Sequence, residues 1–407
     1  MWLGVKKSSF WFYSILFLIL AYPVNIRLLR FFSPPDVVFV FVLAVIFFWG
    51  GLKKSKVDPL VFLFLIFVLV TSFFGSLFFD FSVNYIAFFY KYLLMFLLAW
   101  FILSADLKKE QIELLLKALL FSFYFLVLYV YFYQYRVFSG ARIFPRPDFP
   151  FSSTAGLSSG GHLYGAYLST GVMACSSYWI FISKKSFFWI PLLFLTFGAI
   201  LLTGSRAPMI AMLFGYVILL FVCSFGKNMA ASLKKMFLLM LIISSIAFII
   251  LTVFAGRFAI YEKTMDVIDR SVSFSDIASG SDGSVMGRME KIELGTGTVL
   301  DHSVMFGTGV SSTPFLWVDN SVVRLLIDSG FGGLVLFAII LVLFIVNAFK
   351  TAKTNGNMRL FYVFFLACFT YFVNSVSTEF FLVARSVFPF IILICLLYKL
   401  ISVKRES

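Results

Sequence analysis

Apolar runs of about 20 residues recur along almost the whole chain of 407 residues, and each is long enough to cross a bilayer core as an α-helix. The chain is 61% hydrophobic and 13% charged, which is more apolar surface than a soluble domain of this length can bury. The runs predict an all-α, polytopic integral membrane protein with about 12 transmembrane helices, at residues 9–29, 36–52, 58–76, 84–104, 111–133, 161–182, 186–203, 206–224, 235–255, 331–349, 359–376 and 380–400.

The connections between these spans alternate between a basic side and a nearly neutral side. Numbered alternately from the amino end, one set carries 18 cations and five acids, whereas the other carries 13 cations and 14 acids. Basic connections stay in the cytoplasm, so this bias places both termini there. The net charge of +14 is therefore a topological signal, and we expect no nucleic-acid partner.

Other sequence features exclude several classes of protein. No A-x-A-like cleavage site follows the first run, so we expect an uncleaved first helix. The four cysteines lie in apolar runs without CxxC spacing, which predicts neither a disulfide framework nor a zinc site. No GxxxxGK[ST] pattern is present, so ATP-driven work is not expected.

Two long polar segments lie on the side opposite the basic connections, and long polar loops commonly carry function. They are 134–160, which contains Arg142 and Arg146, and 256–318. The predicted organisation has three parts. Residues 1–255 form a membrane domain of nine spans that includes the loop 134–160, and residues 256–330 form a large loop with catalytic elements. Residues 331–407 form a membrane domain of three spans with a cytoplasmic tail.

The segment "LLTGSRAPMIAML" (201–213) joins two spans by a tight outer turn. Ser205 suits an N-cap and Pro208 suits a first helical turn. Arg206 then lies where a helix exposes free N–H groups, so the side chain and the helix end together favour an anion such as phosphate. The alternative is an interfacial arginine that reaches lipid head groups.

The segment "GRMEKIELGTGTVLDHSVMFGTG" (287–309) has helical spacing. Arg288 and Lys291 are three residues apart and share one face, and Glu290 and Glu293 share an adjacent face. The alternative to a functional face is a solvated amphipathic surface helix, which we favour for the lysine and the glutamates.

The only two histidines of the chain are candidate bases. His302 follows Asp301, with which it could form an acid/base pair. His162 lies at the outer start of a span, where a structural role is the alternative. Gly307 and Gly309 suit a tight return toward the membrane.

The segment "WVDNSVVRLLIDSGFGG" (317–333) leads into 19 residues without a charge. Asn320, Arg324 and Asp328 follow i, i+4, i+8 spacing and line one side of a helix. One interpretation is an Arg324–Asp328 salt bridge, worth about 0.3–0.5 kcal/mol if exposed. The other is the floor of a water-filled cavity, because ionisable residues at membrane depth are candidate functional groups.

These three segments resemble the O-antigen polymerase and O-antigen ligase superfamily of bacterial envelope glycosyltransferases. The first looks like the family's Ser-Arg motif, and the second like its Arg-led outer segment that ends in Gly-x-Gly. The third is similar to the ligase-type pattern of His-Asn, nine residues, Gly, two residues, then Gly, Thr or Tyr, with Asn320, Gly330 and Gly333 in place. Asp319 stands where the ligases have His, and polymerases commonly lack that His.

The resemblance implies a GT-C-like fold in the bacterial inner membrane and an active site that faces the periplasm. It implies transfer of a glycan from undecaprenyl diphosphate onto a second lipid-linked repeat unit, without cofactor or metal. Arg206 and Arg288 would hold the diphosphate, and Asp319 would activate the acceptor hydroxyl, with Asp301, His302 and His162 as alternatives. The expected substrate-binding residues are Arg324, Asn320, Arg142, Arg146, His162 and His302.

Other functions remain open at this point. A ligase would use a similar site with lipid A–core as acceptor, and a capsule or exopolysaccharide polymerase would use other repeat units. A lipid-linked oligosaccharide flippase would need charges at the centres of its spans, where this chain has almost none. The expected partners are the bilayer, the lipid-linked oligosaccharide and a polysaccharide co-polymerase that regulates chain length.

Overall fold

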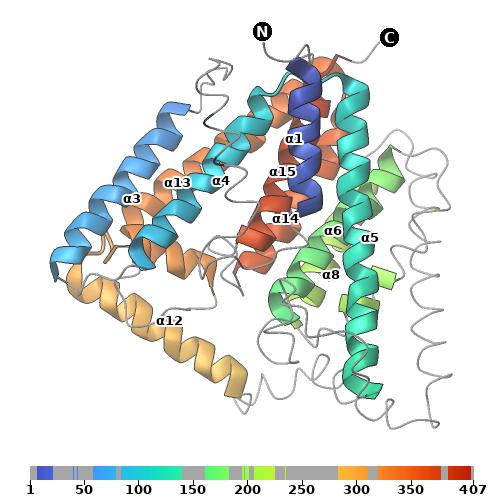
Figure 1. Ribbon diagram of the computed structural model, residues 1–407. Helices are drawn as coiled ribbons and strands as arrows, with labels where there is room; N and C mark the ends of the chain where they lie inside the picture. The colour runs from blue at the N-terminus through green and yellow to red at the C-terminus, as the bar shows by residue number, and fades with distance from the viewer. Residues whose placement is uncertain are drawn as a thin grey trace.

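The computed structural model describes residues 7–21, 40, 44, 58–78, 84–139, 161–182, 195–196, 198–200, 206–224, 234, 283–309, 320–376 and 384–404. This part of the chain consists of helices and their connections, without a strand. Figure 1 shows the helices as a bundle. They are α1 (Lys7–Ala21), α3 (Asp58–Phe78), α4 (Asn84–Ser104), α5 (Lys109–Ser139), α6 (Gly161–Phe181), α8 (Arg206–Ser224), α12 (Gly283–His302), α13 (Ser321–Asn355), α14 (Met358–Ser375) and α15 (Ala384–Ser402).

The predicted spans that fall on described residues coincide with helices. α4 and α8 have the predicted bounds, and α3, α6 and α14 agree to within about two residues. The predicted spans 36–52, 186–203 and 235–255 lie almost wholly outside the described residues. Among the helices described, α13 and α14 are long and apolar enough to cross a membrane. The helical fold is consistent with a membrane protein, and the number of spans stays a prediction.

The helix that contains the predicted tenth span begins before it. The span was predicted from residue 331, and α13 runs from Ser321 to Asn355 with a break at Gly330. The polar first part of α13 therefore lies within the segment predicted as the large outer loop. α12 is a second helix within the segment predicted as the large loop.

α6, α8 and α14 form a closely packed group. Hydroxyl and amide side chains join them, since Ser176 and Tyr216 share a hydrogen bond of 3.0 Å and Asn374 donates one of 2.9 Å to Ser169. Gly215 brings α8 close to both neighbours, because a Cβ there would lie 3.0 Å from the side chains of Met173 and Thr370. Such small residues and interhelical hydrogen bonds are typical of helix packing in membranes.

These contacts also fix the directions of the helices. Successive positions of α6 meet successive positions of α8, so these two helices run parallel, whereas α14 runs antiparallel to α6. Asn355 and Asn357 at the α13–α14 turn donate to carbonyls at the end of α15. The starts of α6, α8 and α13 therefore lie at one end of the bundle, opposite the end at which α15 finishes.

Candidate functional site

The polar start of α13 is fixed by Asn320, which caps the helix. Its Oδ1 accepts hydrogen bonds of 2.9 Å and 3.0 Å from the backbone N–H groups of Val322 and Val323. Asn320 is only 9% exposed, so these N–H groups would be costly to bury without the cap. The structure thus gives Asn320 a structural role that the sequence analysis did not assign.

Arg324 and Asp328 form a buried ion pair one turn further along. Nε of Arg324 lies 2.9 Å from Oδ1 of Asp328, and the two side chains are 2% and 0% exposed. The predicted salt bridge is confirmed. The stabilisation of about 0.3–0.5 kcal/mol expected for an exposed pair does not apply, because this pair is buried. Removing one partner of a buried pair typically costs about 3–5 kcal/mol, because the other charge stays buried.

Two neighbouring helices contact this pair. The hydroxyl of Tyr92 on α4 donates a hydrogen bond of 3.0 Å to Oδ2 of Asp328. The hydroxyl of Thr71 on α3 donates one of 3.3 Å to the backbone carbonyl of the same aspartate. The sequence analysis missed both residues. A tyrosine or threonine inside an apolar run gives no signal of a partner more than 200 positions away.

α13 breaks at Gly330, directly after the ion pair. Gly330 has φ 64° and ψ −171°, a conformation that is essentially restricted to glycine. The residues on its two sides have helical dihedral angles, so the break interrupts the hydrogen-bond ladder of one long helix.

The segment 303–309 satisfies the backbone groups that the break leaves open. The N–H groups of Phe331 and Gly332 donate to the carbonyls of Val304 and Met305 at 2.9 Å and 3.0 Å. On the other side of the break, the N–H of Thr308 donates to the carbonyl of Ile327 at 2.8 Å. Irregular backbone at membrane depth requires such partners from the protein itself.

Gly307 allows the segment to come this close. It has φ 71°, and a Cβ at this position would lie 2.5 Å from the backbone N of Gly330. Gly309 has φ 88° and contacts the backbone of α3 at Ser72. The predicted tight return at these two glycines is confirmed, and its purpose is to fill the break in α13.

α12 packs against the first part of α13. Val299 and Ile327 form a small apolar cluster, separate from the main core. Gly295 makes room for it, since a Cβ there would lie 2.7 Å from the Cδ1 of Ile327. In Figure 1, α12 lies across the end of the bundle that is remote from the start of α1 and the end of α15.

α12 exposes apolar as well as charged residues. The exposed apolar side chains are those of Met286, Met289, Leu294 and Leu300, and the exposed charged ones include Glu290 and Glu293. The expected surface helix is therefore confirmed, but its surface is partly apolar. Such a helix suits the interface between a bilayer and water.

The predicted site residues fall into three groups. Asn320 and Arg324 lie side by side in the first turns of α13. Arg206 begins α8 and His162 lies in the first turn of α6, at the same end of the bundle, while Arg288 and His302 lie on α12. For these four residues the structure describes the backbone, not the side chains. Asp319, Arg142 and Arg146 lie outside the described residues, so their roles stay predictions.

The arrangement is a buried polar network at one end of a helical bundle. Arg324 pairs with Asp328, whose carboxylate also accepts a hydrogen bond from Tyr92, beside the start and the break of α13. Among the described residues, no three His, Cys, Asp or Glu side chains form a group that could hold a metal ion. All four cysteines are buried and none forms a disulfide.

The described residues form a helical bundle with polar groups around a broken helix. This arrangement is consistent with a helical membrane protein. No curated protein matches the chain. Residues 191–338, however, match a family described as O-antigen ligase. This match includes Arg206, α12, the segment 303–309 and the break in α13. This match places residues 191–338 in the O-antigen polymerase and ligase superfamily, which the sequence motifs predicted.

Proposed function

We propose that this protein is an O-antigen or related surface-polysaccharide polymerase. It joins undecaprenyl-diphosphate-linked repeat units at the periplasmic face of the bacterial inner membrane. The growing glycan moves from its lipid diphosphate onto the incoming lipid-linked repeat. The observation that carries this proposal is the family match over 191–338, because it contains Arg206, α12, the segment 303–309 and the broken start of α13.

In this mechanism the arginines stabilise negative charge on the diphosphate. Arg206, at the start of α8, and Arg288, on α12, bind the diphosphate and stabilise the charge that develops on it as the glycosidic bond breaks. Asp319 accepts the proton of the attacking hydroxyl. Arg324 is held by Asp328, so it offers a fixed guanidinium at the same end of the bundle, and Arg142, Arg146, His162 and His302 contact the sugars.

The polymerase is preferred over a ligase because of one residue. The ligase-type pattern begins with His-Asn, whereas this chain has Asp319 before Asn320. A ligase would also transfer the glycan to lipid A–core instead of a second repeat unit. The proposed topology has both termini in the cytoplasm, and a polysaccharide co-polymerase sets the chain length.

A lipopolysaccharide gel tests this proposal in a strain that lacks the gene. We expect core with a single repeat unit, and a full ladder after complementation with the wild type. Arg288→Ala should not restore the ladder at normal protein level, whereas Lys291→Ala, on the same face of α12, should restore it. Complete loss of O-antigen with accumulated long lipid-linked chains would indicate a ligase. An unchanged ladder would contradict a role in O-antigen synthesis.

A further inference from the structure

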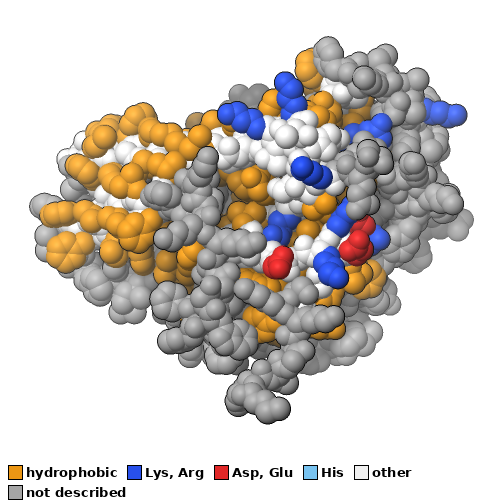
Figure 2. Space-filling view, turned by 90° about the horizontal axis from the view of Figure 1, so that it is seen from above, with side chains coloured by type: hydrophobic (Ala, Val, Ile, Leu, Met, Phe, Trp, Pro, Cys, Tyr) orange, Lys and Arg blue, Asp and Glu red, His pale blue; other side chains and the backbone are white. Residues whose placement is uncertain are grey.

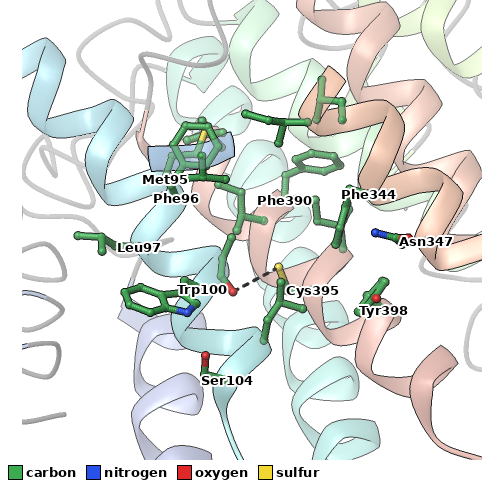
Figure 3. Close-up of a pocket in the computed structure, with 18 of the residues that line it drawn as sticks. Met95, Phe96, Leu97, Trp100, Ser104, Phe344, Asn347, Phe390, Cys395 and Tyr398 are labelled. Carbon is green, nitrogen blue, oxygen red and sulfur yellow. Dashed lines mark hydrogen bonds between the residues drawn. The ribbon is translucent and has the colours of Figure 1, made fainter. Parts of the chain in front are cut away.

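A large groove lies between α3, α4, α13 and α15. Its volume is about 1470 Å³, which exceeds the ~300–1,000 Å³ of ordinary small-molecule pockets. Figure 3 shows that Phe96 and Trp100 of α4, Phe344 of α13 and Phe390 of α15 line it. The groove is therefore a mainly apolar space that is walled by these helices.

One end of the groove is polar and basic. Asn347, Lys350 and Thr351 line it from α13, and Lys399 and Ser402 line it from α15. Nζ of Lys399 donates a hydrogen bond of 3.0 Å to the carbonyl of Leu103 at the end of α4, so its ammonium is fixed there. Figure 2 looks onto this end of the molecule and shows lysine and arginine side chains with acidic ones among them.

The basic end of the groove lies far from Arg324. The rise along α13 from Gly330 to Lys350 is about 30 Å, which equals the thickness of a bilayer core. A head group at Lys350 therefore lies at the opposite membrane surface from the broken part of α13. The groove residues span about 20 Å on α13, from Phe337 to Lys350, and about 22 Å on α4, from Phe89 to Ser104, close to the depth of one leaflet with its head groups.

We propose that this groove binds an anionic glycerophospholipid from the leaflet next to the start of α1 and the end of α15. The phosphate lies at Lys350 and Lys399, and an acyl chain runs along Phe96, Phe344 and Phe390. The charge of the rim selects an anionic head group, and the length of the apolar walls fits a lipid of one leaflet. The acids at this end whose side chains the structure describes, Asp106, Glu110 and Glu113, do not line the groove.

This lipid site does not rest on the proposed transferase function, so its test needs no enzyme activity. Trp100 provides the probe because it lines the groove. The full-length protein is placed in phosphatidylcholine nanodiscs that contain brominated phosphatidylglycerol or brominated phosphatidylcholine, and tryptophan quenching is measured. The Trp100→Phe variant isolates the signal of Trp100.

We expect brominated phosphatidylglycerol to quench Trp100 at a lower mole fraction than brominated phosphatidylcholine. One lysine near an anionic head group contributes roughly a fivefold preference. Lys350→Gln should therefore reduce the preference about fivefold. Lys353→Gln is the matched control, because Lys353 is exposed on the same helix and does not line the groove.

Equal quenching of Trp100 by the two lipids in the wild type would overturn the proposal. An equal loss of preference in the Lys353 and Lys350 variants would also overturn it, since that result indicates only general surface charge. So would native mass spectra in which the purified protein retains a polyprenyl lipid in place of a glycerophospholipid.

Discussion

Tyr92 on α4 donates a hydrogen bond of 3.0 Å to the carboxylate of Asp328, which lies 236 positions away on α13. The same carboxylate holds Arg324 at 2.9 Å. The tyrosine therefore supports the arginine indirectly, through the aspartate between them. All three side chains are almost fully buried, so the chain keeps a charged group in its interior at the start of a long apolar helix.

A double-mutant cycle tests the contact between Tyr92 and Asp328. A buried hydrogen bond to a charged group contributes about 1.5–3 kcal/mol, so Tyr92→Phe should lower the free energy of unfolding by about that amount. Asp328→Asn should cost more, because Arg324 then loses its counter-charge. Thermal unfolding in detergent should show that the stability losses of the two single variants do not add in the variant that carries both Tyr92→Phe and Asp328→Asn. Strict additivity would mean that the hydrogen bond does not stabilise the fold.

A triple replacement separates the structural role of Arg324 from its proposed functional role. Tyr92→Phe, Arg324→Met and Asp328→Leu together remove every member of the network and leave apolar groups. Buried ion pairs replaced in this way often keep or gain stability. We expect normal protein levels and unfolding temperature, with loss of polymer on the gel. A normal ladder would show that Arg324 does not act on the substrate.

The break in α13 should tolerate no side chain at Gly330. Alanine there would adopt a strained conformation that costs about 1–3 kcal/mol, and its Cβ would also collide with the backbone of Met305. Gly297→Ala in α12 is the matched control, because nothing lies within 4 Å of a Cβ there. It should raise stability by about 0.5–1 kcal/mol through helix propensity. Unfolding temperatures that change equally in both variants would contradict this account of the break.

Replacement of Asn320 distinguishes its cap from a contact with substrate. Asn320→Ala should cost about 0.5–2 kcal/mol, because two buried N–H groups lose their acceptor. Asn320→Ser restores an N-cap oxygen and should restore most of the stability. If the cap is its whole role, the serine variant should also restore the polysaccharide ladder. A stable serine variant without a ladder would assign Asn320 to the substrate site as well.

The sequence predicted much of the fold because span positions follow from local hydropathy. The bounds of α4 and α8 needed only the ends of apolar runs. The tight return at Gly307 and Gly309 was predicted from the special dihedral freedom of glycine. The contact of segment 303–309 with the break in α13 could not be predicted. Backbone contacts between distant segments leave no pattern in the sequence.

The candidate site was predictable only in part. Spacing placed Asn320, Arg324 and Asp328 on one side of a helix, and the ion pair follows from that spacing. Burial of the pair depends on Tyr92 and Thr71, which α4 and α3 bring to it. No local pattern relates these residues to Asp328, so their role emerges only from the packed helices.

The most direct measurement of the central claim is a reconstituted reaction. The purified protein is mixed with an undecaprenyl-diphosphate-linked repeat unit as its only substrate. A metal chelator is present and lipid A–core is absent, and the products are separated by size. Polymerase activity predicts a series of longer lipid-linked glycans and released undecaprenyl diphosphate, both lost in Arg288→Ala but kept in Lys291→Ala. Absence of longer glycans until lipid A–core is added would contradict the polymerase assignment.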